Sequence, residues 1–134
     1  MIDSNIPASK KTIMVVDDNP DIVTIVKTLL EGNGFKVQPA SSGQEVFILL
    51  AKKKPTLIIL DIMMPQMNGM EVLLRLRRNP DTRSVPVILM TGKGNDEDVY
   101  RGYNFGADYY VKKPFDTFNL MAGINLLLGE RNLN

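Results

Sequence analysis

The sequence predicts one α/β domain with a five-stranded parallel β-sheet covered by helices on both faces. Short apolar runs alternate about five times with segments of helical periodicity, a pattern that favours parallel strands joined by right-handed crossovers. The runs at 13–16, 57–60 and 87–90 are apolar at every position, as expected for strands buried on both faces. A length of 134 residues with 44% hydrophobic content is sufficient for one hydrophobic core.

The first half of the chain carries signals for two strands and two helices. Asn19 is suited to cap a helix that has Pro20 in its first position. Ser42 and Glu45 have the spacing of a capping box at the start of a second helix. The elements predicted here are a strand at 13–16, a helix from 19 to 34, a strand at 35–39, and a helix that begins at 42 and is closed by 52–55.

The second half repeats this alternation three times. Pro65 and the Asn68-Gly69 pair restrict the chain after Asp61 to a tight loop before a helix restarts at Met70. The elements predicted here are a strand at 57–60, a helix from 70 to 78, a strand at 87–90, a helix with an acidic start at 95–98 that reaches 103, a strand at 109–111, and a last helix capped by Asp116.

Composition excludes several classes of function. The chain has no cysteine and no histidine, which removes disulfides, thiol catalysis, histidine bases, Ser/His/Asp triads and ordinary zinc sites. A net charge of +1 does not indicate a nucleic acid or an anionic membrane as partner. No apolar run approaches the ~20 residues of a membrane span, so we expect a cytoplasmic protein. Residues 1–10 are expected to be a flexible leader before a folded domain at 11–134.

Polar side chains follow four of the predicted strands and are expected to meet at one edge of the sheet. They are Asp17 and Asp18, Asp61, Thr91, and Lys113. Three converging carboxylates repel one another unless a cation holds them. Three carboxylates, one lysine and one Mg²⁺ sum to zero formal charge, and hard oxygen ligands suit Mg²⁺ better than a soft transition metal.

This set of residues is suited to phosphoryl transfer. A phosphoryl group at this edge would be stabilised by Mg²⁺, by the Lys113 ammonium and by the Thr91 hydroxyl. Asp61 is the candidate nucleophile, because a carboxylate accepts a phosphoryl group directly to give an acyl phosphate.

With these motifs, the sequence closely resembles the receiver domain of two-component response regulators. The resemblance runs from about residue 11 to residue 128 and is carried by 15–19 (VVDDN), 60–69 (LDIMMPQMNG), 90–92 (MTG), 106–108 (GAD) and 113–115 (KPF). It implies a flavodoxin-like, doubly wound (βα)5 three-layer sandwich with strand order 2-1-3-4-5.

The resemblance also implies a role for each acid. Asp61 would be the phosphoacceptor. Asp18 and Asp61 would ligate Mg²⁺ directly, together with the backbone carbonyl of Met63, and Asp17 would act mainly through water. Mn²⁺ is expected to be able to replace Mg²⁺.

Further roles are implied for four residues in or directly after the last two strands. Thr91 and Lys113 would contact the phosphoryl group, with Pro114 distinguishing Lys113 from its neighbour Lys112. Thr91 and Tyr110 would form the switch. The bond before Pro114 is the place of a cis peptide.

The implied donor of the phosphoryl group is a histidine kinase or a phosphotransfer protein. The implied output partner is a downstream protein target or a fused effector domain. Partner binding would change through the surface of the fourth helix, fifth strand and fifth helix, in a monomer or a phosphorylation-dependent dimer. We expect no multiple-turnover enzyme, no direct nucleic-acid contact and no membrane contact.

Two rival functions and several simpler interpretations remain at this stage. A phosphohydrolase would use the same aspartyl phosphate, but it commonly has a second acid two residues later, where this chain has Met63. A scaffold of the same shape would bind partners without phosphorylation. Taken singly, the residues are a helix cap (17–19), a turn residue (Asp61), a strand-end hydroxyl (Thr91), a surface amine (Lys113) and a packing aromatic (Tyr110).

Overall fold

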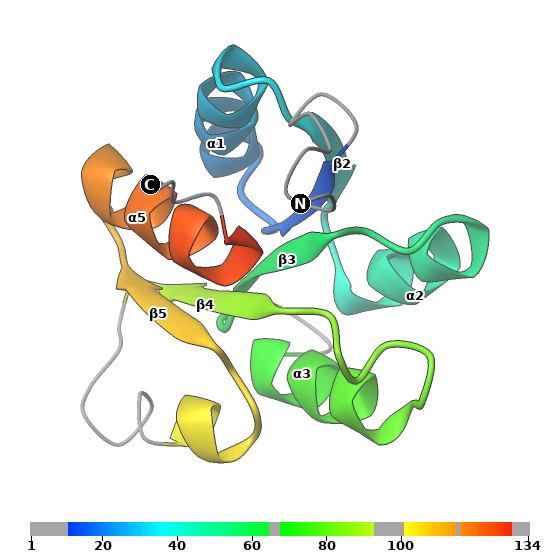
Figure 1. The fold of residues 1–134 in the computed structure, drawn as a ribbon. Helices are drawn as coiled ribbons and strands as arrows, with labels where there is room; N and C mark the ends of the chain where they lie inside the picture. The colour runs from blue at the N-terminus through cyan, green and yellow to red at the C-terminus, as the bar shows by residue number, and fades with distance from the viewer. Residues whose placement is uncertain (1–10, 65–67, 93–100, 115, 130–134) are drawn as a thin grey trace.

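The computed structural model of the chain describes residues 11–64, 68–92, 101–114 and 116–129 (Figure 1). Its labelled elements are β1 (Thr12–Val16), α1 (Pro20–Gly32), β2 (Lys36–Ala40), α2 (Gly43–Lys52), β3 (Leu57–Asp61), α3 (Gly69–Arg78), β4 (Val87–Thr91), β5 (Tyr109–Lys112) and α5 (Thr117–Leu128). Residues 101–104 are also helical. The five strands are parallel and lie in the order β2-β1-β3-β4-β5, which confirms the predicted fold class.

Helices cover both faces of the sheet, as Figure 1 shows, with α1 and α5 on one side and α2 and α3 on the other. Alternate side chains of a strand point to opposite faces. In β1, Met14 and Val16 pack towards α2 and α3, whereas Ile13 and Val15 pack towards α1 and α5. All residues of β1, β3 and β4 are buried, which explains why their sequences are apolar at almost every position.

The strand ends differ slightly from those expected. β3 and β4 each extend one residue further than predicted, so that Asp61 and Thr91 are the last residues of their strands. β2 begins at Lys36 because the N–H of Phe35 donates instead to the carbonyl of Leu30 at 3.0 Å, closing the end of α1. These shifts leave the predicted polar edge of the sheet intact.

Polar side chains fix the first turn of four helices. Asn19, Ser42, Asn68 and Asp116 each accept a hydrogen bond from a backbone N–H of the helix that follows, and such caps satisfy donors that have no intrahelical partner. The starts expected from Asn19, Ser42 and Asp116 are therefore confirmed. Glu45 departs from the expected capping box, since its carboxylate accepts from the N–H of the residue before the cap at 2.7 Å.

Some expectations fall on segments outside the described residues. They are the leader at 1–10, Pro65 in the loop after β3, the helix start at 95–98, and the last residues at 130–134. Within the described ranges, no helix is long and apolar enough to cross a membrane.

Arg77 of α3 links several segments by hydrogen bonds at the edge of the sheet opposite the polar residues. Its guanidinium donates to the carbonyls of Gly106 and Val85 at 2.9 and 2.8 Å, and to the Asp108 carboxylate at 2.9 Å. The same carboxylate oxygen accepts from the N–H of Val87 at 2.9 Å. Gly106 has φ +104, and a Cβ there would lie 2.9 Å from Arg77 Nε, so both its backbone and its neighbour require glycine.

We predict that Arg77→Met lowers the free energy of unfolding by roughly 2–4 kcal/mol, because it leaves several enclosed acceptors without a donor. Arg75→Met is the matched control. Arg75 is exposed and forms an ion pair with Glu71 at 3.1 Å, so its replacement should cost less than about 1 kcal/mol. Urea unfolding measures both values, and equal losses in the two variants would show that the Arg77 contacts do not stabilise the fold.

Candidate functional site

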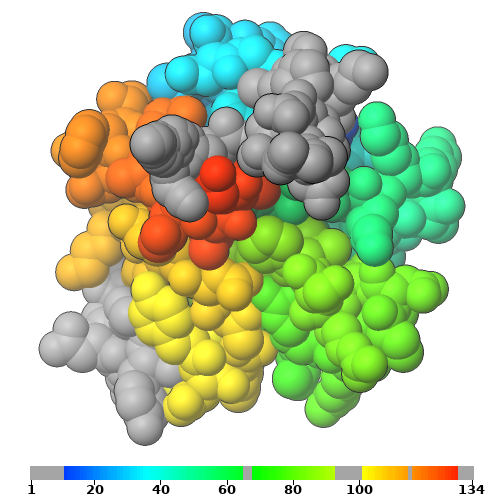
Figure 2. Space-filling view, in the orientation of Figure 1, coloured from blue at the N-terminus to red at the C-terminus, as the bar shows by residue number. Residues whose placement is uncertain are grey.

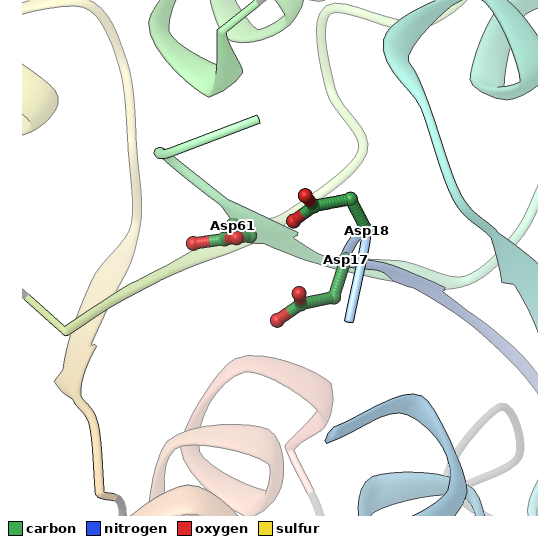
Figure 3. A group of neighbouring side chains, drawn as sticks. All are labelled: Asp17, Asp18 and Asp61. Atoms are coloured by element: carbon green, nitrogen blue, oxygen red, sulfur yellow. The ribbon is translucent and has the colours of Figure 1, made fainter. Parts of the chain in front are cut away.

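Four strands deliver polar side chains to one edge of the sheet. Asp17 follows β1 directly, Asp61 ends β3, Thr91 ends β4, and Lys113 follows β5. The carboxylates of Asp17, Asp18 and Asp61 lie close together (Figure 3), with one oxygen from each within 4.8 Å of the others. The three carboxylates that the sequence predicted to converge therefore do lie together.

Lys113 is the cation at the centre of this cluster. Its ammonium lies 2.7 Å from Asp17 Oδ2 and 3.5 Å from Asp61 Oδ2. The shorter contact has the distance of an ion pair but not the geometry of a hydrogen bond, so Asp17 Oδ2 has no hydrogen-bond partner among the described residues. Lys112 is exposed and Lys113 is not, so the geometry selects Lys113 as the site lysine. The Lys113–Pro114 bond, where a cis peptide was expected, is cis.

Asp61 is held in an environment that disfavours its charge. Its exposed fraction is 3%. The pKa of Asp61 is raised to about 6, first by burial and then by the Asp17 carboxylate, while the Lys113 ammonium and the N–H of Met63 lower it. The N–H of Met63 donates to Asp61 Oδ1 at 3.3 Å. With three carboxylates beside Lys113, the site has more acidic groups than its own lysine can neutralise.

The donor set fits a hard divalent cation. It contains three carboxylates, of which Asp18 is exposed and the other two are buried, and the buried Asp17 Oδ2 lacks a hydrogen bond within the described residues. Such oxygen ligands with room for water suit Mg²⁺ or Mn²⁺. Asp17, Asp18 and Asp61 would hold the ion, and a contribution from the Met63 carbonyl stays a prediction. The Met63 side chain is exposed.

The loop after β3 is fixed by a close approach at Gly69. Its N–H donates to the carbonyl of Ile62 at 2.8 Å. A Cβ at Gly69 would overlap the carbonyl oxygen of Asp61 and lie 2.8 Å from Ile62 Cα. Glycine at this position therefore lets the start of α3 pack directly on the backbone that carries the candidate nucleophile.

The two candidate switch residues lie on neighbouring strands. Thr91 is buried. Tyr110 packs towards the α2 and α3 side of the sheet, beside Gly102, with its hydroxyl oxygen buried. Tyr109 faces the other side, where a Cβ at Gly123 would lie 2.6 Å from its ring. A switching role for Thr91 and Tyr110 stays a prediction.

A cavity of about 450 Å³ opens beside the acidic cluster, between the start of α1 and the segment joining β2 to α2. Asp17, Asp18, Thr24, Ser41 and Glu45 contribute to its lining. Sequence reasoning did not assign Thr24 or Ser41 to the site. No local motif marks them, because Thr24 of α1 and Ser41 after β2 are brought to one cavity only by the packing of β2 beside β1.

Comparison with known proteins identifies the family. Residues 13–125 match the response regulator receiver domain. The chain belongs to the response regulator receiver domain family. Receiver domains generally bind Mg²⁺ at an acidic pocket, and this chain has a cluster of Asp17, Asp18 and Asp61 that could hold a metal ion.

Curated relatives include longer regulators that contain a receiver domain. The chain is 40% identical over 116 residues to the phosphate regulon transcriptional regulatory protein PhoB of Rhizobium meliloti, covering 87% of this chain and 51% of that protein. It is 39% identical to the DNA-binding dual master transcriptional regulator RpaA of Synechocystis, covering 87% of this chain and 48% of that protein. The chain thus spans about half the length of these two relatives.

Solved structures support the same fold. A putative response regulator from Chloroflexus aurantiacus superimposes with a TM-score of 0.85 at 28% identity, covering 89% of this chain and 98% of the other. The chemotaxis protein CheY4 of Vibrio cholerae gives a TM-score of 0.82 at 26% identity, covering 87% of this chain and 98% of the other. The predicted family and the flavodoxin-like fold are confirmed.

We predict that Gly69→Ala lowers the free energy of unfolding by about 1–3 kcal/mol, because the added methyl group forces α3 away from the Asp61 backbone. Gly32→Ala is the control. A Cβ at Gly32, the last residue of α1, meets nothing within 4 Å, so its effect should be neutral or slightly stabilising. Chemical unfolding compares the two, and a Gly69→Ala receiver domain as stable as the Gly32→Ala variant would contradict the close approach.

We predict a pH-dependent effect of Asp61→Asn on stability in the absence of divalent cations. The pKa of Asp61 is raised from 3.8 to about 6, so the folded chain keeps a proton that the unfolded chain releases, and stability falls as pH rises through this window. Asp61→Asn should raise the free energy of unfolding by roughly 1–3 kcal/mol at pH 8 and by little at pH 4.

The measurement is urea unfolding in EDTA at both pH values. Asp81→Asn, at an exposed position near the opposite edge of the sheet, controls for the loss of one negative charge. A gain at pH 4 as large as the gain at pH 8 would contradict the raised pKa.

Proposed function

We propose that this receiver domain is a phosphorylation-activated switch whose phosphoacceptor is Asp61. The observation that carries the proposal is the buried Asp61 carboxylate, 3.5 Å from the Lys113 ammonium and beside two further carboxylates. Asp61 supplies the nucleophile and Lys113 supplies a fixed positive charge. The acid cluster provides ligands for Mg²⁺, which would offset the charge of the incoming phosphoryl group.

The transfer proceeds from a phosphohistidine on a partner protein. An Asp61 oxygen attacks phosphorus, the phosphorus–nitrogen bond of the donor breaks, and the acyl phosphate forms on Asp61 while the donor imidazole regains its nitrogen lone pair. Lys113 pairs with one phosphoryl oxygen, and the Thr91 hydroxyl donates a hydrogen bond to another. The donor is a histidine kinase or a phosphotransfer protein, since this chain contains no histidine.

The two switch residues transmit the effect of phosphorylation from the site to the surface. The new charge draws the Thr91 hydroxyl towards the phosphoryl group, and Tyr110 repacks against its neighbours. These changes alter the surface formed by the fourth helix, β5 and α5, which binds a downstream protein or a fused effector domain. The receiver domain acts as a monomer or as a dimer that depends on phosphorylation.

Repeated turnover of a small phosphoester does not fit the site. The position two residues after Asp61 holds Met63, whose exposed thioether is neither a general acid nor a general base. The proposed function is therefore that of a self-limited phosphoacceptor in the cytoplasm.

We predict that Asp61→Asn reduces phosphoryl incorporation from acetyl phosphate and Mg²⁺ to the level of the uncatalysed reaction, because the amide is not a nucleophile for phosphorus. Intact-protein mass spectrometry measures the incorporation. Asp81→Asn is the charge-matched control and should be phosphorylated like the original chain. Replacement of Mg²⁺ by Mn²⁺ should preserve the reaction, and EDTA should stop it.

Three results would overturn the proposal, and each would point to a different conclusion. Unchanged incorporation in Asp61→Asn would remove Asp61 as the phosphoacceptor. Many phosphates released per protein from small phosphoesters would favour a phosphohydrolase. Absent Mg²⁺ affinity together with partner binding that Asp61→Asn leaves unchanged would favour a scaffold.

A further inference from the structure

Glu45 makes contacts that a helix cap does not explain. In a capping box, the carboxylate at this position accepts from the backbone N–H of the cap residue, which here is Ser42. The Glu45 carboxylate instead accepts from the N–H of Ser41 at 2.7 Å and from the Ser41 hydroxyl at 3.0 Å. It therefore holds the residue that follows β2, and not the cap of its own helix.

One peptide unit connects Glu45 to the acidic cluster. The N–H of Ser41 and the carbonyl of Ala40 belong to the same planar peptide group. That N–H donates to Glu45, and that carbonyl accepts from the N–H of Asp17 at 3.1 Å. A charged acceptor on the N–H polarises the peptide group and strengthens the bond that its carbonyl accepts. The Glu45 carboxylate therefore acts on the backbone of Asp17 through two consecutive hydrogen bonds.

The backbone of Asp17 is bonded to an edge strand and needs this support. Its acceptor, Ala40, ends β2, which is the outermost strand on one side of the sheet and is partly exposed. The N–H of Lys113, by contrast, donates at 2.7 Å to Thr91 of β4, an interior strand that is buried throughout. An edge strand has a sheet neighbour on one side only, so the position of the Ala40 carbonyl depends more on groups outside the sheet. Glu45 is such a group.

The backbone position of Asp17 determines where its carboxylate lies. Asp17 Oδ1 accepts from the N–H of Asn19 at 2.9 Å, and Oδ2 lies 2.7 Å from the Lys113 ammonium. Both contacts change if the end of β1 shifts. A binding site requires its groups to be held within about 0.5 Å of the productive geometry, so a small displacement of this backbone would be felt by a bound cation.

Glu45 is itself held firmly beside the cluster. Its N–H donates to the Ser42 hydroxyl at 3.1 Å, and the next residue, Val46, is fully buried. Glu45 lines the same cavity as Asp17 and Asp18. Figure 2 shows α2, in turquoise, at the surface of the molecule, and the Glu45 side chain is half-buried. Its replacement therefore does not remove a side chain from the apolar core.

We propose that Glu45 is a positioning residue for the cation site and acts on Asp17 through the 40–41 peptide unit. The carboxylates that could hold the ion are those of Asp17, Asp18 and Asp61, so Glu45 acts on a ligand rather than as one. This inference rests on the proposed function, since it concerns the same Mg²⁺ site. Groups that orient metal ligands typically change metal affinity about 10- to 100-fold when they are replaced.

The first test is the affinity of the full chain for Mg²⁺, measured by isothermal titration calorimetry. Glu45→Ala removes the acceptor of the Ser41 N–H and should weaken binding about fivefold to tenfold, because Glu45 acts one hydrogen bond further from the ion than an ordinary orienting group. Glu45→Gln keeps a neutral oxygen acceptor and should stay within about threefold of the original chain. A group that only stabilises the fold would leave the affinity of the folded protein unchanged.

Glu71→Ala is the matched control, because Glu71 has the same position in α3 that Glu45 has in α2. Each is the third helical residue and donates its N–H to the cap side chain, Asn68 or Ser42. The Glu71 carboxylate pairs with Arg75, so its loss should leave Mg²⁺ affinity within about twofold. Equal weakening by Glu71→Ala, or by Glu45→Gln and Glu45→Ala alike, would show an effect of net charge and overturn the positioning role.

The second test follows the Asp17 amide by NMR hydrogen exchange in EDTA and needs no cation. Glu45→Ala should speed exchange at Asp17 about threefold to tenfold, and Glu45→Gln should preserve most of the protection. The Ile62 amide, which donates to the carbonyl of Met90 at 2.9 Å just after β3, is the internal control and should be unaffected. Unchanged exchange at Asp17, or equal acceleration at both amides, would contradict the proposed connection.

These results separate the role of Glu45 from the proposed function. Urea unfolding checks that each variant is folded during the titration, and a Glu45→Ala chain that does not fold would assign Glu45 to stability alone. An original chain without Mg²⁺ affinity would overturn the metal site, and with it both proposals. A Glu45→Ala chain that binds Mg²⁺ as tightly as the original would overturn only the role of Glu45 and leave Asp61 as the proposed phosphoacceptor.

Discussion

The ammonium of Lys113 between two buried carboxylates is the interaction on which the arrangement of this receiver domain depends. It lies 2.7 Å from Asp17 and 3.5 Å from Asp61, and these three residues come from the ends of β1, β3 and β5. The contact forms only when β1, β3, β4 and β5 lie side by side in this order and in a common register. The sheet therefore brings together charged residues that are far apart in the sequence. Burying these charges is unfavourable, and the packing of the apolar core compensates for that cost.

Buried charges are balanced differently at the Arg77 edge of the sheet and at the edge that carries the acidic cluster. At the Arg77 edge, the guanidinium donates to several carbonyls and to one carboxylate, so its donors have partners and the edge is tied together. At the other edge, three carboxylates face one lysine, and the pKa of Asp61 is raised to about 6. The polar groups of the first edge are satisfied by the chain itself, whereas the negative charge of the second edge would need a cation to balance it.

Local signals were sufficient to predict the fold and most of the site. Each buried strand, helix cap and turn is marked by residues that lie within a few positions of one another in the sequence. Long-range contacts were not predictable in this way. Arg77 is one of three arginines near the end of α3, and its partners Gly106 and Asp108 are 29 and 31 residues away. The adjacent tyrosines pose the same difficulty. Alternation along a strand puts Tyr109 and Tyr110 on opposite faces, but only the packing of β5 in the sheet decides which face each one takes.

The outer surface of α5 is presented in a fixed orientation because the helix is held at two points. Asp116 caps its first turn by accepting from the N–H of Phe118 at 2.8 Å, and Gly123 lets the middle of the helix lie against the ring of Tyr109. An alanine at position 123 would meet that ring, so the absence of a side chain there sets how closely α5 approaches β5. The same contact that buries one side of α5 thus determines which side chains face outward. The exposure of Phe118 and Leu126 follows from this packing.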